Sequence, residues 1–571
     1  MNYLAVDFGT TNCLAGIITP NKTIEFIPLE PDGTVMMPSA LYIYAPHLER
    51  INTSESYVNK KIEDAIIANN EYIKLEEERI ARQLNDFTIA NRPRIKKFNP
   101  SDYIDNPKAY ARALKFHEID KNEFNDRLKY FEDVLIKQEE LRLRSLLRKP
   151  KSLLEIKRET IVQLDQSIAL QRSNELREHT VFSAIASDEF ELLIGSEAIS
   201  KYVSDPLCGF FLRSPKSFLG AKPHPQLEEL FVQIITRMLK IIKVKSEKST
   251  GQNFDGIVLG RPINYIGANS EIENDNALSI MRRASKAAGF SEVRFVMEPL
   301  SAALVISRDI FDTNDPALIV DIGGGTTDIA YLDISKDDSL KIKIESTSGE
   351  RVGGNNFDHS IALKLFGEFI GESAKLKSGV LVPNEIIHAC LNTLDIYKQL
   401  WFIKQGEKID SYIQDSVDKI PLERLYVIFR DQLQHRLLLR AEALKIESTK
   451  LNNCKFDIDF LPYPFEVNLN KADILNICSS AFNKIINNIN YAVDNSINKN
   501  RKLKVFFTGG MSFSDDLINS IMDKIPSGSS AQRIAGFTAV ISGLAVVARQ
   551  LSLSNSVLLE PDNVRGIPVL K

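Results

Sequence analysis

Short apolar runs alternate with amphipathic stretches along most of this chain. The first run, YLAVDFG, starts at residue 3, and a second run, CLAGIIT, follows it after a turn. Apolar runs of this length that end at turn residues are typical of buried strands. Similar runs predict strands at 41–45, 179–186, 191–198, 254–262, 293–298, 317–323, 328–335 and 502–510. Strands that alternate with helical stretches predict an α/β fold, in which helices cover the faces of the sheets.

The pattern changes between residues 56 and 179. This segment is rich in charged residues and leucine and contains no glycine, which favours long helices. Two interpretations of these helices stay open. They form a hairpin that docks a partner protein, or they form a solvated insertion that packs only on itself.

Composition narrows the class of protein. With 571 residues, the chain is long enough for roughly three to five folding units. Its formal net charge is only −4, so we expect neither a nucleic-acid partner nor an anionic membrane. The basic run at 92–97 lies among acidic helices and has no interleaved aromatic residues, so it is interpreted as a solvated face.

Cysteine usage and the N-terminal sequence indicate the cytoplasm. The five cysteines are scattered and show no CxxC spacing, so we expect neither a disulfide framework nor a zinc site. The stretch MNYLAVDFG enters an apolar run at once, so we expect no secretory leader. We also expect no membrane span, because no run of about 18 apolar residues stands out.

Two similar phrases lie far apart in the sequence. VDFGTTN covers 6–12 and DIGGGTTD covers 321–328. Glycines let the backbone turn sharply and bring its amide groups close to an anion, and threonine hydroxyls add further donors. The leading aspartate of each phrase could hold a hydrated divalent cation beside a phosphate. The pair therefore predicts two loops that grip one nucleotide.

The order of further motifs sharpens this prediction. MEPLSAAL at 297–304 precedes the second loop, and VFFTGGMS at 505–512 and the small-residue stretch AVISGLAVVA at 539–548 follow it. This order resembles the actin, hexokinase and 70-kilodalton heat-shock chaperone superfamily, in which two similar lobes close over one ATP. Each motif alone is weak, and the order is what discriminates.

Longer stretches resemble the heat-shock chaperone branch. They are RSPKSFLG at 213–220, GRPIN at 260–264, KAAGFSEVRFVMEPLSAAL at 286–304, SGERVGGNNFDHSIA at 348–362 and RAEALKIEST at 440–449. The combination of GRP, SPKSFLG and EP is most similar to the YegD-type branch. The resemblance covers about 1–45 and 180–550, and 56–179 has no counterpart in it.

The resemblance implies a two-lobed, actin-like ATPase fold, with ribonuclease H-like sheets flanked by helices and a large helical insertion. It also implies that too few residues follow Val547 for a peptide-binding domain. The implied domains are 1–55 and 180–318 as the two parts of lobe I, 56–179 as the helical insertion, 319–530 as lobe II, and 531–571 as a return helix to lobe I with a C-terminal tail.

The resemblance further implies a site for ATP and Mg²⁺. Asp7 and Asp321 would hold the water molecules around Mg²⁺. The implied catalytic residues are Lys216, which would position or polarise the attacking water, with Glu298, Asp328 and Thr326. The implied nucleotide contacts are Gly9, Thr10, Thr11, Asn12, Gly323, Gly324, Gly325, Thr327, Gly353, Gly354, Glu442, Lys445, Thr449, Gly509, Gly510 and Met511.

The implied function is a heat-shock-type ATPase that transfers the terminal phosphoryl group of ATP to water. Its implied partners are ATP or ADP, unfolded clients or co-chaperones, and a protein docked on the 56–179 helices. Two alternatives stay open: a small-molecule kinase of the same superfamily, and a nucleotide-dependent scaffold with little hydrolysis.

Some positions depart from the chaperone pattern. Asn355 and Asn356 stand where acidic residues are usual, and EIENDN at 271–276 lacks the arginine that couples nucleotide state to client binding. We therefore do not expect the usual allosteric coupling. For Glu442 and Lys445, an interpretation as a plain surface ion pair at helical spacing also stays open.

Overall fold

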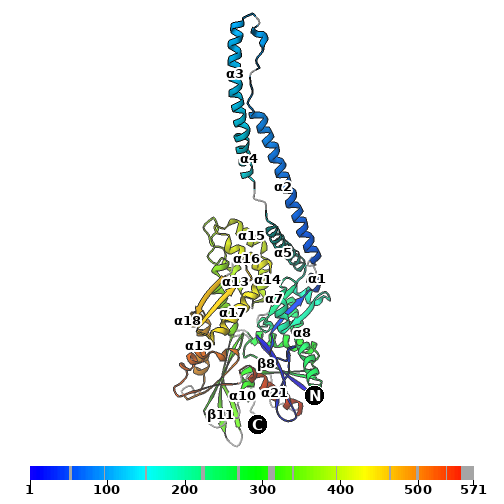
Figure 1. Ribbon diagram of the computed structural model, residues 1–571. Coiled ribbons are helices and arrows are strands. Elements are labelled where there is room, and N and C mark those ends of the chain that lie inside the picture. Colours follow the sequence, from blue (N-terminus) through cyan, green and yellow to red (C-terminus); the bar gives the residue numbers. More distant parts are fainter. Residues whose placement is uncertain are drawn as a thin grey trace. The chain divides into compact units, whose positions relative to one another are not determined.

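The structure is a computed structural model with a mixed α/β fold, as the sequence predicted (Figure 1). The chain divides into two compact units. One comprises Met1–Glu49 with Ala169–Lys571, and the other comprises Arg50–Ile168. The described residues are 1–49, 55–95, 97–103, 105–147, 151–219, 225–265, 271–305, 315–336, 340–393, 395–461, 465–496, 501–534 and 536–553.

The first unit contains a sheet built around the N-terminal strand. Its strand order is β3-β2-β1-β8-β9, and β4 also pairs with β2. Strand β1 runs antiparallel to β2 and parallel to β8. Its continuous apolar run suits this place, because both faces of a central strand are covered. The strands are β1 (Tyr3–Phe8), β2 (Asn12–Ile18), β3 (Ile24–Phe26), β4 (Met37–Pro38), β8 (Gly256–Arg261) and β9 (Glu292–Met297).

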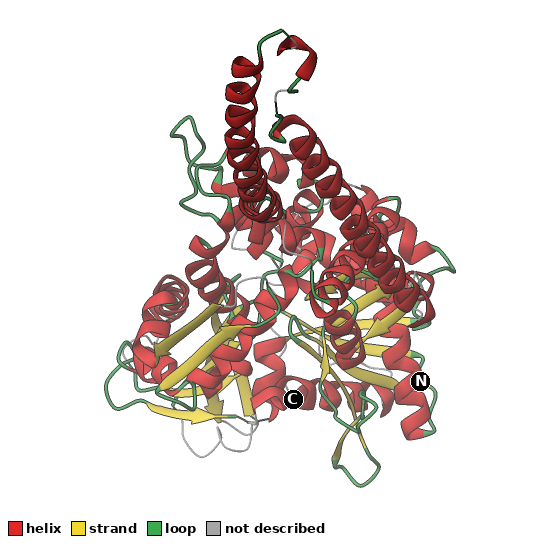
Figure 2. Cartoon of the chain, turned by 45° about the horizontal axis from the view of Figure 1, so that its top comes forward, coloured by secondary structure: helices red, strands yellow, loops and turns green. Residues whose placement is uncertain are grey.

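A second sheet of this unit repeats the arrangement with later segments. Its order is β12-β11-β10-β15-β16, and β10 runs antiparallel to β11 and parallel to β15. Figure 2 shows the strands in separate groups with helices around them. The two phrases noted in the sequence therefore occupy equivalent places, at the ends of β1 and β10. The strands are β10 (Ala317–Ile322), β11 (Thr327–Lys336), β12 (Leu340–Glu350), β15 (Lys504–Thr508) and β16 (Ser530–Arg533).

Two small-residue helices, α10 (Glu298–Val305) and α21 (Ala539–Leu553), pack closely against each other. Ser301 Oγ donates to Val540 O at 2.9 Å, and a Cβ on Gly543 would lie 1.9 Å from Ser301 O. Within the described residues, the window Gly536–Leu553 is the one helix long and apolar enough to cross a membrane, and 56% of it is buried. Because α21 packs on β1, β2 and β8, its apolar character is that of a core helix.

One predicted strand, at 179–186, is wrong. Val181–Ala186 form helix α6. Thr180 and Ser183 make a capping box, in which each side chain accepts from the backbone N–H of the other. This pairing satisfies the free N–H groups of a first helical turn, so it favours a helix over an extended strand.

The strand predicted at 191–198 is half right. Strand β6 (Glu191–Ile194) ends where helix α7 (Gly195–Ser204) begins, because Gly195 takes a φ of +68° that breaks the strand. Together with β5 (Ala40–Tyr44) and β7 (Gly209–Arg213), β6 forms a three-stranded sheet.

Helices and a hairpin complete the first unit, and all five cysteines are buried as free thiols. The helices are α1 (Pro46–Glu49), α8 (Pro225–Thr250), α9 (Glu271–Ala287), α12 (Gly354–Phe366), α13 (Asn384–Leu391), α14 (Ile396–Phe402), α15 (Gly406–Asp415), α16 (Ile420–Arg430), α17 (Gln434–Ser448), α18 (Lys471–Ile477), α19 (Ser479–Asp494) and α20 (Asp515–Met522), and the hairpin strands are β13 (Asn453–Ile458) and β14 (Phe465–Asn470).

The described residues of the second unit form helices and the segments that connect them. Phe87 stacks on Phe131 with ring centroids 6.2 Å apart, and Arg92 pairs with Glu132 at 3.7 Å. Many of its large apolar side chains stay exposed, including Phe116 at 62%. Its helices are α2 (Glu55–Asn91), α3 (Pro107–Tyr130), a π-helical turn at Phe131–Leu135, α4 (Ile136–Ser145) and the first part of α5 (Leu153–Arg177).

Candidate functional site

The two glycine-threonine turns face each other. A Cβ on Gly324 would lie 1.8 Å from Thr11 Oγ1, and a Cβ on Gly325 would lie 2.8 Å from Thr10 Oγ1. Only glycine permits so close an approach. Two phrases that are distant in the sequence therefore meet at one place in the fold.

Four carboxylates gather beside these turns. Asp321 and Asp328 are buried in β10 and β11, Asp7 is partly buried in β1, and Glu298 begins α10. Burial, and then the charge of Glu298, raise the pKa of Asp7 to about 7. The same two causes raise the pKa of Asp328 to about 7, and they raise that of Asp321 well above its ordinary value. A bound cation would relieve this repulsion.

Lys216 places one positive charge among these carboxylates. It is 7% exposed on the short turn Pro215–Phe218, and its Nζ donates to Glu298 Oε1 at 2.5 Å. Burial alone would lower the pKa of this lysine, but the charges of Glu298 and Asp7 outweigh burial and raise it. Lys216 is therefore a fixed cation and not a proton acceptor at neutral pH.

The turn that carries Lys216 begins at a strained residue. Ser214 has a φ of +55° and precedes a proline, and both features disfavour its conformation. Ser214 N donates to Ser39 O at 2.8 Å, and Asn355 Nδ2 donates to Ser214 Oγ at 3.4 Å. Strain of about 1–3 kcal/mol persists only where the surroundings fix it. Asn355, one of the departures from the chaperone pattern, thus helps to place Lys216.

The two threonines of the second turn behave differently. The Thr326 side chain donates to Asp328, whose Oδ1 also accepts from Ile263 N at 2.6 Å. Thr327 is fully buried, and its hydroxyl donates to Val352 O at 2.7 Å. The side chain of Thr326 therefore lies at the site, whereas that of Thr327 packs in the core.

Two glycine pairs enclose the second turn. Gly354 N donates to Gly323 O at 3.0 Å, and a Cβ on Gly353 would lie 2.6 Å from the same oxygen. Gly509 has a φ of +82°, and a Cβ there would lie 2.6 Å from Asp321 Oδ1. These glycines leave the backbone next to Asp321 free of side chains.

Helix α17 adds two charged residues, which do not pair with each other. Glu442 Oε2 accepts from Arg213 Nη2 at 2.8 Å, and Lys445 Nζ lies 2.8 Å from Asp358 Oδ1. The interpretation of Glu442 and Lys445 as one surface ion pair is therefore wrong. The Arg213 contact joins β7, beside the first sheet, to a helix that packs with the second.

The structure also describes the remaining expected contacts. A Cβ on Gly354 would lie 3.2 Å from Lys445 Nζ and 3.5 Å from Met511 Sδ, so these groups adjoin. Thr449 is exposed just after α17 and donates to Ile446 O. Two further close approaches involve Gly9, where a Cβ would lie 2.2 Å from Asn12 O, and Gly510, where it would lie 2.8 Å from Phe537 Cε1.

The donor set suits a hydrated magnesium ion. Asp7 and Asp321 supply carboxylate oxygens, which Mg²⁺ prefers, and Mg²⁺ keeps several of its water molecules when it binds. Within the part of the chain that the structure describes, no group of three or more His, Cys, Asp or Glu forms a full protein cage. Two carboxylates, water and phosphate oxygens together are the usual environment of Mg²⁺ in nucleotide sites.

The sequence analysis missed Tyr265, which directly follows GRPIN. Its side chain is 5% exposed, and its Oη has no hydrogen-bond partner among the described residues. Burial raises its pKa to about 12, and the charges of Lys216 and Glu298 act on it with opposite signs. A buried hydroxyl without a partner costs about 1–3 kcal/mol, so this group is available to a ligand. No local pattern marks it, because its place depends on the carboxylates around it.

We expect the ligand-free protein to lose stability as the pH rises from about 4 to about 7. The pKa values of Asp7 and Asp328 rise from 3.8 to about 7 on folding, so the folded state holds these protons more tightly. The contribution of these two groups to the free energy of unfolding is therefore complete below about pH 4. It is lost as the pH rises to about 7. In thermal melts, the melting temperature of the parent should fall by a few degrees over this pH range. The fall should be smaller in Asp7→Asn and unchanged in the control Asp333→Asn, whose side chain is half-exposed. Equal pH dependence in Asp7→Asn and the parent would contradict this.

Comparison with known proteins finds similarity in this region. The family model described as Hsp70 protein matches residues 226–385. The chaperone protein DnaK of Halobacterium salinarum (strain ATCC 29341 / DSM 671 / R1) is 29% identical over 205 residues, which are 35% of this chain and 30% of that protein. The chaperone protein DnaK of Mycoplasma mycoides subsp. mycoides SC is 28% identical over 217 residues, which are 37% of this chain and 34% of that protein.

The chain is similar to Hsp70-type chaperones. It spans about a third of the length of the curated relatives that it matches. The matched stretch 226–385 contains Glu298, the second glycine-threonine turn and the pair Gly353–Gly354. The matches therefore support the heat-shock branch of the superfamily that the motifs suggested.

Proposed function

We propose that this protein binds ATP with Mg²⁺ and hydrolyses it, as a heat-shock-type, chaperone-like ATPase. The observation that supports this best is the meeting of two glycine-threonine turns, each led by an aspartate at the end of the central strand of its sheet. Backbone amide groups of such turns bind phosphate. The aspartates would hold the hydrated metal ion next to it.

In this proposal the chain positions groups and charges and forms no covalent intermediate. The hydroxyls of Thr10 and Thr11 donate to phosphate oxygens, Thr326 holds Asp328 in place, and Lys216 polarises the attacking water as a permanent cation. Asp328, with a pKa of about 7, is suited to accept a proton from that water near neutral pH. Mg²⁺, when bound, offsets the charge that develops on the phosphates.

The adenosine would lie between the glycine pairs and helix α17. The adjoining Gly354, Lys445 and Met511 would border the base and ribose with Glu442 and Thr449. Because Glu442 is already bonded to Arg213, a nucleotide at this place would meet an ordered carboxylate. The same bond would tie strand β7 to helix α17 beside the nucleotide.

We further propose that the two sheets with their helices are the two lobes of an actin-like ATPase of the YegD-type branch, acting in the cytoplasm. Unfolded clients or co-chaperones are the proposed partners. We also propose that the helices of the second unit dock a protein, because large apolar side chains are exposed on them, among them Ile67, Leu75 and Phe116.

Equilibrium ATP binding and phosphate release, each with and without Mg²⁺, test the proposal. Hydrolysis that needs Mg²⁺ and no added acceptor supports the ATPase. Phosphate transfer that appears only with sugars or polyols would favour the small-molecule kinase. Tight binding with no measurable turnover would favour the scaffold.

Tyr265→Phe should lower ATP hydrolysis by about tenfold and leave the protein as stable as the parent, or more so. The variant removes a buried hydroxyl that has no hydrogen-bond partner among the described residues, so folding loses none of the described bonds. A hydroxyl that donates to the phosphate or to the attacking water would be missed only in the loaded site.

Thermal melts and steady-state hydrolysis measure the two effects. Tyr42→Phe is the matched control, because the Tyr42 hydroxyl donates to Asp205 O at 2.5 Å and serves only the fold. It should lose stability and keep turnover per folded molecule. Unchanged turnover in Tyr265→Phe would remove Tyr265 from the mechanism.

A further inference from the structure

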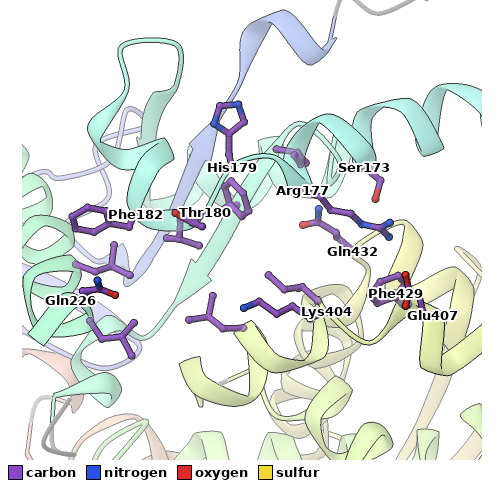
Figure 3. Close-up of a pocket in the computed structure, with 18 residues that line it drawn as sticks. Ser173, Arg177, His179, Thr180, Phe182, Gln226, Lys404, Glu407, Phe429 and Gln432 are labelled. Atoms are coloured by element: carbon purple, nitrogen blue, oxygen red, sulfur yellow. The ribbon is translucent and has the colours of Figure 1, made fainter. Parts of the chain in front are cut away.

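A cavity lies in the first unit (Figure 3). None of the residues proposed to hold the nucleotide lines it. Its volume is about 1010 Å³, which is at the upper end of the range of small-molecule sites. Four separate parts of the chain line it: the end of α5 with the start of α6, strand β7, the start of α8, and the segment from α14 to α16. A cavity assembled from so many elements is a product of the tertiary fold.

Most of the lining is apolar, and its deepest side chains are buried. The apolar lining includes Leu176, Phe210, Leu227, Leu230, Leu400 and Ile403. Removal of an apolar ligand from water onto such a surface is favourable. This apolar part of the lining therefore suits a hydrocarbon chain or a run of apolar side chains.

One side of the cavity is built for an anion. The Arg177 guanidinium lies 5.2 Å from the centre of the Phe429 ring, and Figure 3 shows it pointing toward Phe429 and Glu407. A Cβ on Gly406 would lie 3.8 Å from Arg177 Nη2 and 2.7 Å from Phe429 Cε1. Glycine at 406 therefore leaves room for the Phe429 ring at the start of α15, beside the guanidinium.

The start of α15 and a second cation add to this anionic preference. Helix α15 has no side-chain cap, and its first backbone N–H groups have no acceptor within the helix. Lys404 also lines the cavity. Among the ion pairs of the described residues, none involves Arg177 or Lys404. Among the described residues of the lining, Glu407 is the one carboxylate, against these two cations.

A small hollow adjoins the cavity and carries a separate sign of a missing partner. It measures about 30 Å³, shares Phe210, Leu400 and Ile403 with the cavity, and is also lined by Gln434 and His435. Gln434 Oε1 and His435 Nδ1 have no hydrogen-bond partner among the described residues, although both side chains are more than nine-tenths buried. Buried polar atoms are rarely left unpaired, so this hollow is built to meet a bound molecule or its water.

We propose that this cavity binds an apolar chain that ends in a carboxylate. The carboxylate lies at Arg177 and the start of α15, and the apolar chain lies along Leu227, Leu230 and Leu400. Such a ligand is a free amphipathic acid or the C-terminus of an apolar peptide. The site is independent of the proposed ATPase, because the two share no residue.

Fluorescence of Trp401, the single tryptophan of the chain, reports on this site, because Trp401 directly follows Leu400 on α14. The full-length protein is titrated with dodecanoate below its micelle concentration and with dodecanol as the uncharged match. An apolar pentapeptide with a free C-terminus and the same peptide with an amidated C-terminus distinguish the two sources. We expect saturable binding of at least one carboxylate probe, at least tenfold tighter than its uncharged match.

Arg177 is exposed, and Arg177→Gln should weaken carboxylate binding at least tenfold and leave dodecanol binding unchanged. Lys404→Gln should also weaken carboxylate binding. Lys398→Gln, an exposed position of α14 outside the lining, is the matched control and should bind like the parent. Binding of dodecanoate and dodecanol with equal affinity overturns the proposal. So does carboxylate binding that Arg177→Gln does not change.

Discussion

Asp7→Asn and Asp321→Asn should each lower ATP hydrolysis by about 100-fold or more, and the remaining activity should depend little on Mg²⁺. Each change keeps the shape of the side chain and removes the charge that would hold the hydrated ion. Loss of one preorganised charge at a reacting phosphate typically costs two to three orders of magnitude in rate. Phosphate release, measured over a series of Mg²⁺ concentrations, checks both parts of the prediction.

The raised pKa values of these carboxylates indicate that a loss of stability does not explain the lower activity of the two variants. Because the pKa of Asp7 is raised to about 7 and that of Asp321 is raised as well, their charges oppose folding at neutral pH, and asparagine relieves the repulsion. Both variants should therefore melt no lower than the parent. Asp333→Asn, on the strand that carries Asp328, should keep its turnover. Turnover of Asp7→Asn within about twofold of the parent would mean that no metal is held there.

Lys216→Ala should hydrolyse ATP about 100 to 1000 times more slowly and bind it almost normally. A charge that acts mainly on the attacking water is felt in the transition state and little in the ground state. Single-turnover hydrolysis and equilibrium binding separate the two effects. Equal losses of binding and turnover would make Lys216 a ligand for ATP instead.

The variant Lys216→Ala needs a second variant as a control, because Lys216 neutralises the charge of Glu298. Their bond is 2.5 Å long, and both side chains are nearly fully buried. Breaking such a pair on one side typically costs about 3–5 kcal/mol of stability. The double variant Lys216→Met with Glu298→Gln removes both charges and should melt close to the parent. If it binds ATP and does not hydrolyse it, the loss belongs to the chemistry and not to the fold.

Local patterns determined much of the architecture. The apolar runs that became β1, β5, β8, β9, β10, β11 and β15 were visible in the sequence because each is short, apolar and closed by turn residues. The wrong prediction of a strand at 179–186 has a local cause as well. An apolar run of six residues fits a strand or a helix, and the decision lies in the bonds between Thr180 and Ser183, which compete with extended structure.

The repeated phrases also carried real information about the candidate site. Each joins a strand end to a glycine-threonine turn, and the fold brings both turns into contact. The sequence could predict that the two loops belong together, because they have the same chemistry. It could not tell which threonine of the second turn faces the site, since that follows from Val352, which takes the hydroxyl of Thr327.

By itself, the sequence determined the α/β class, the positions of most strands and the two turns, because these depend on neighbouring residues. The tertiary structure alone decided the pairs that cross the fold. Lys216 meets Glu298, Arg213 meets Glu442, and Tyr265 is left without a partner among charged groups. It also decided the strained Ser214 and the cavity at Arg177. Such features depend on which distant segments meet and on how much water they exclude, and neither quantity is encoded in the spacing of residues along the chain.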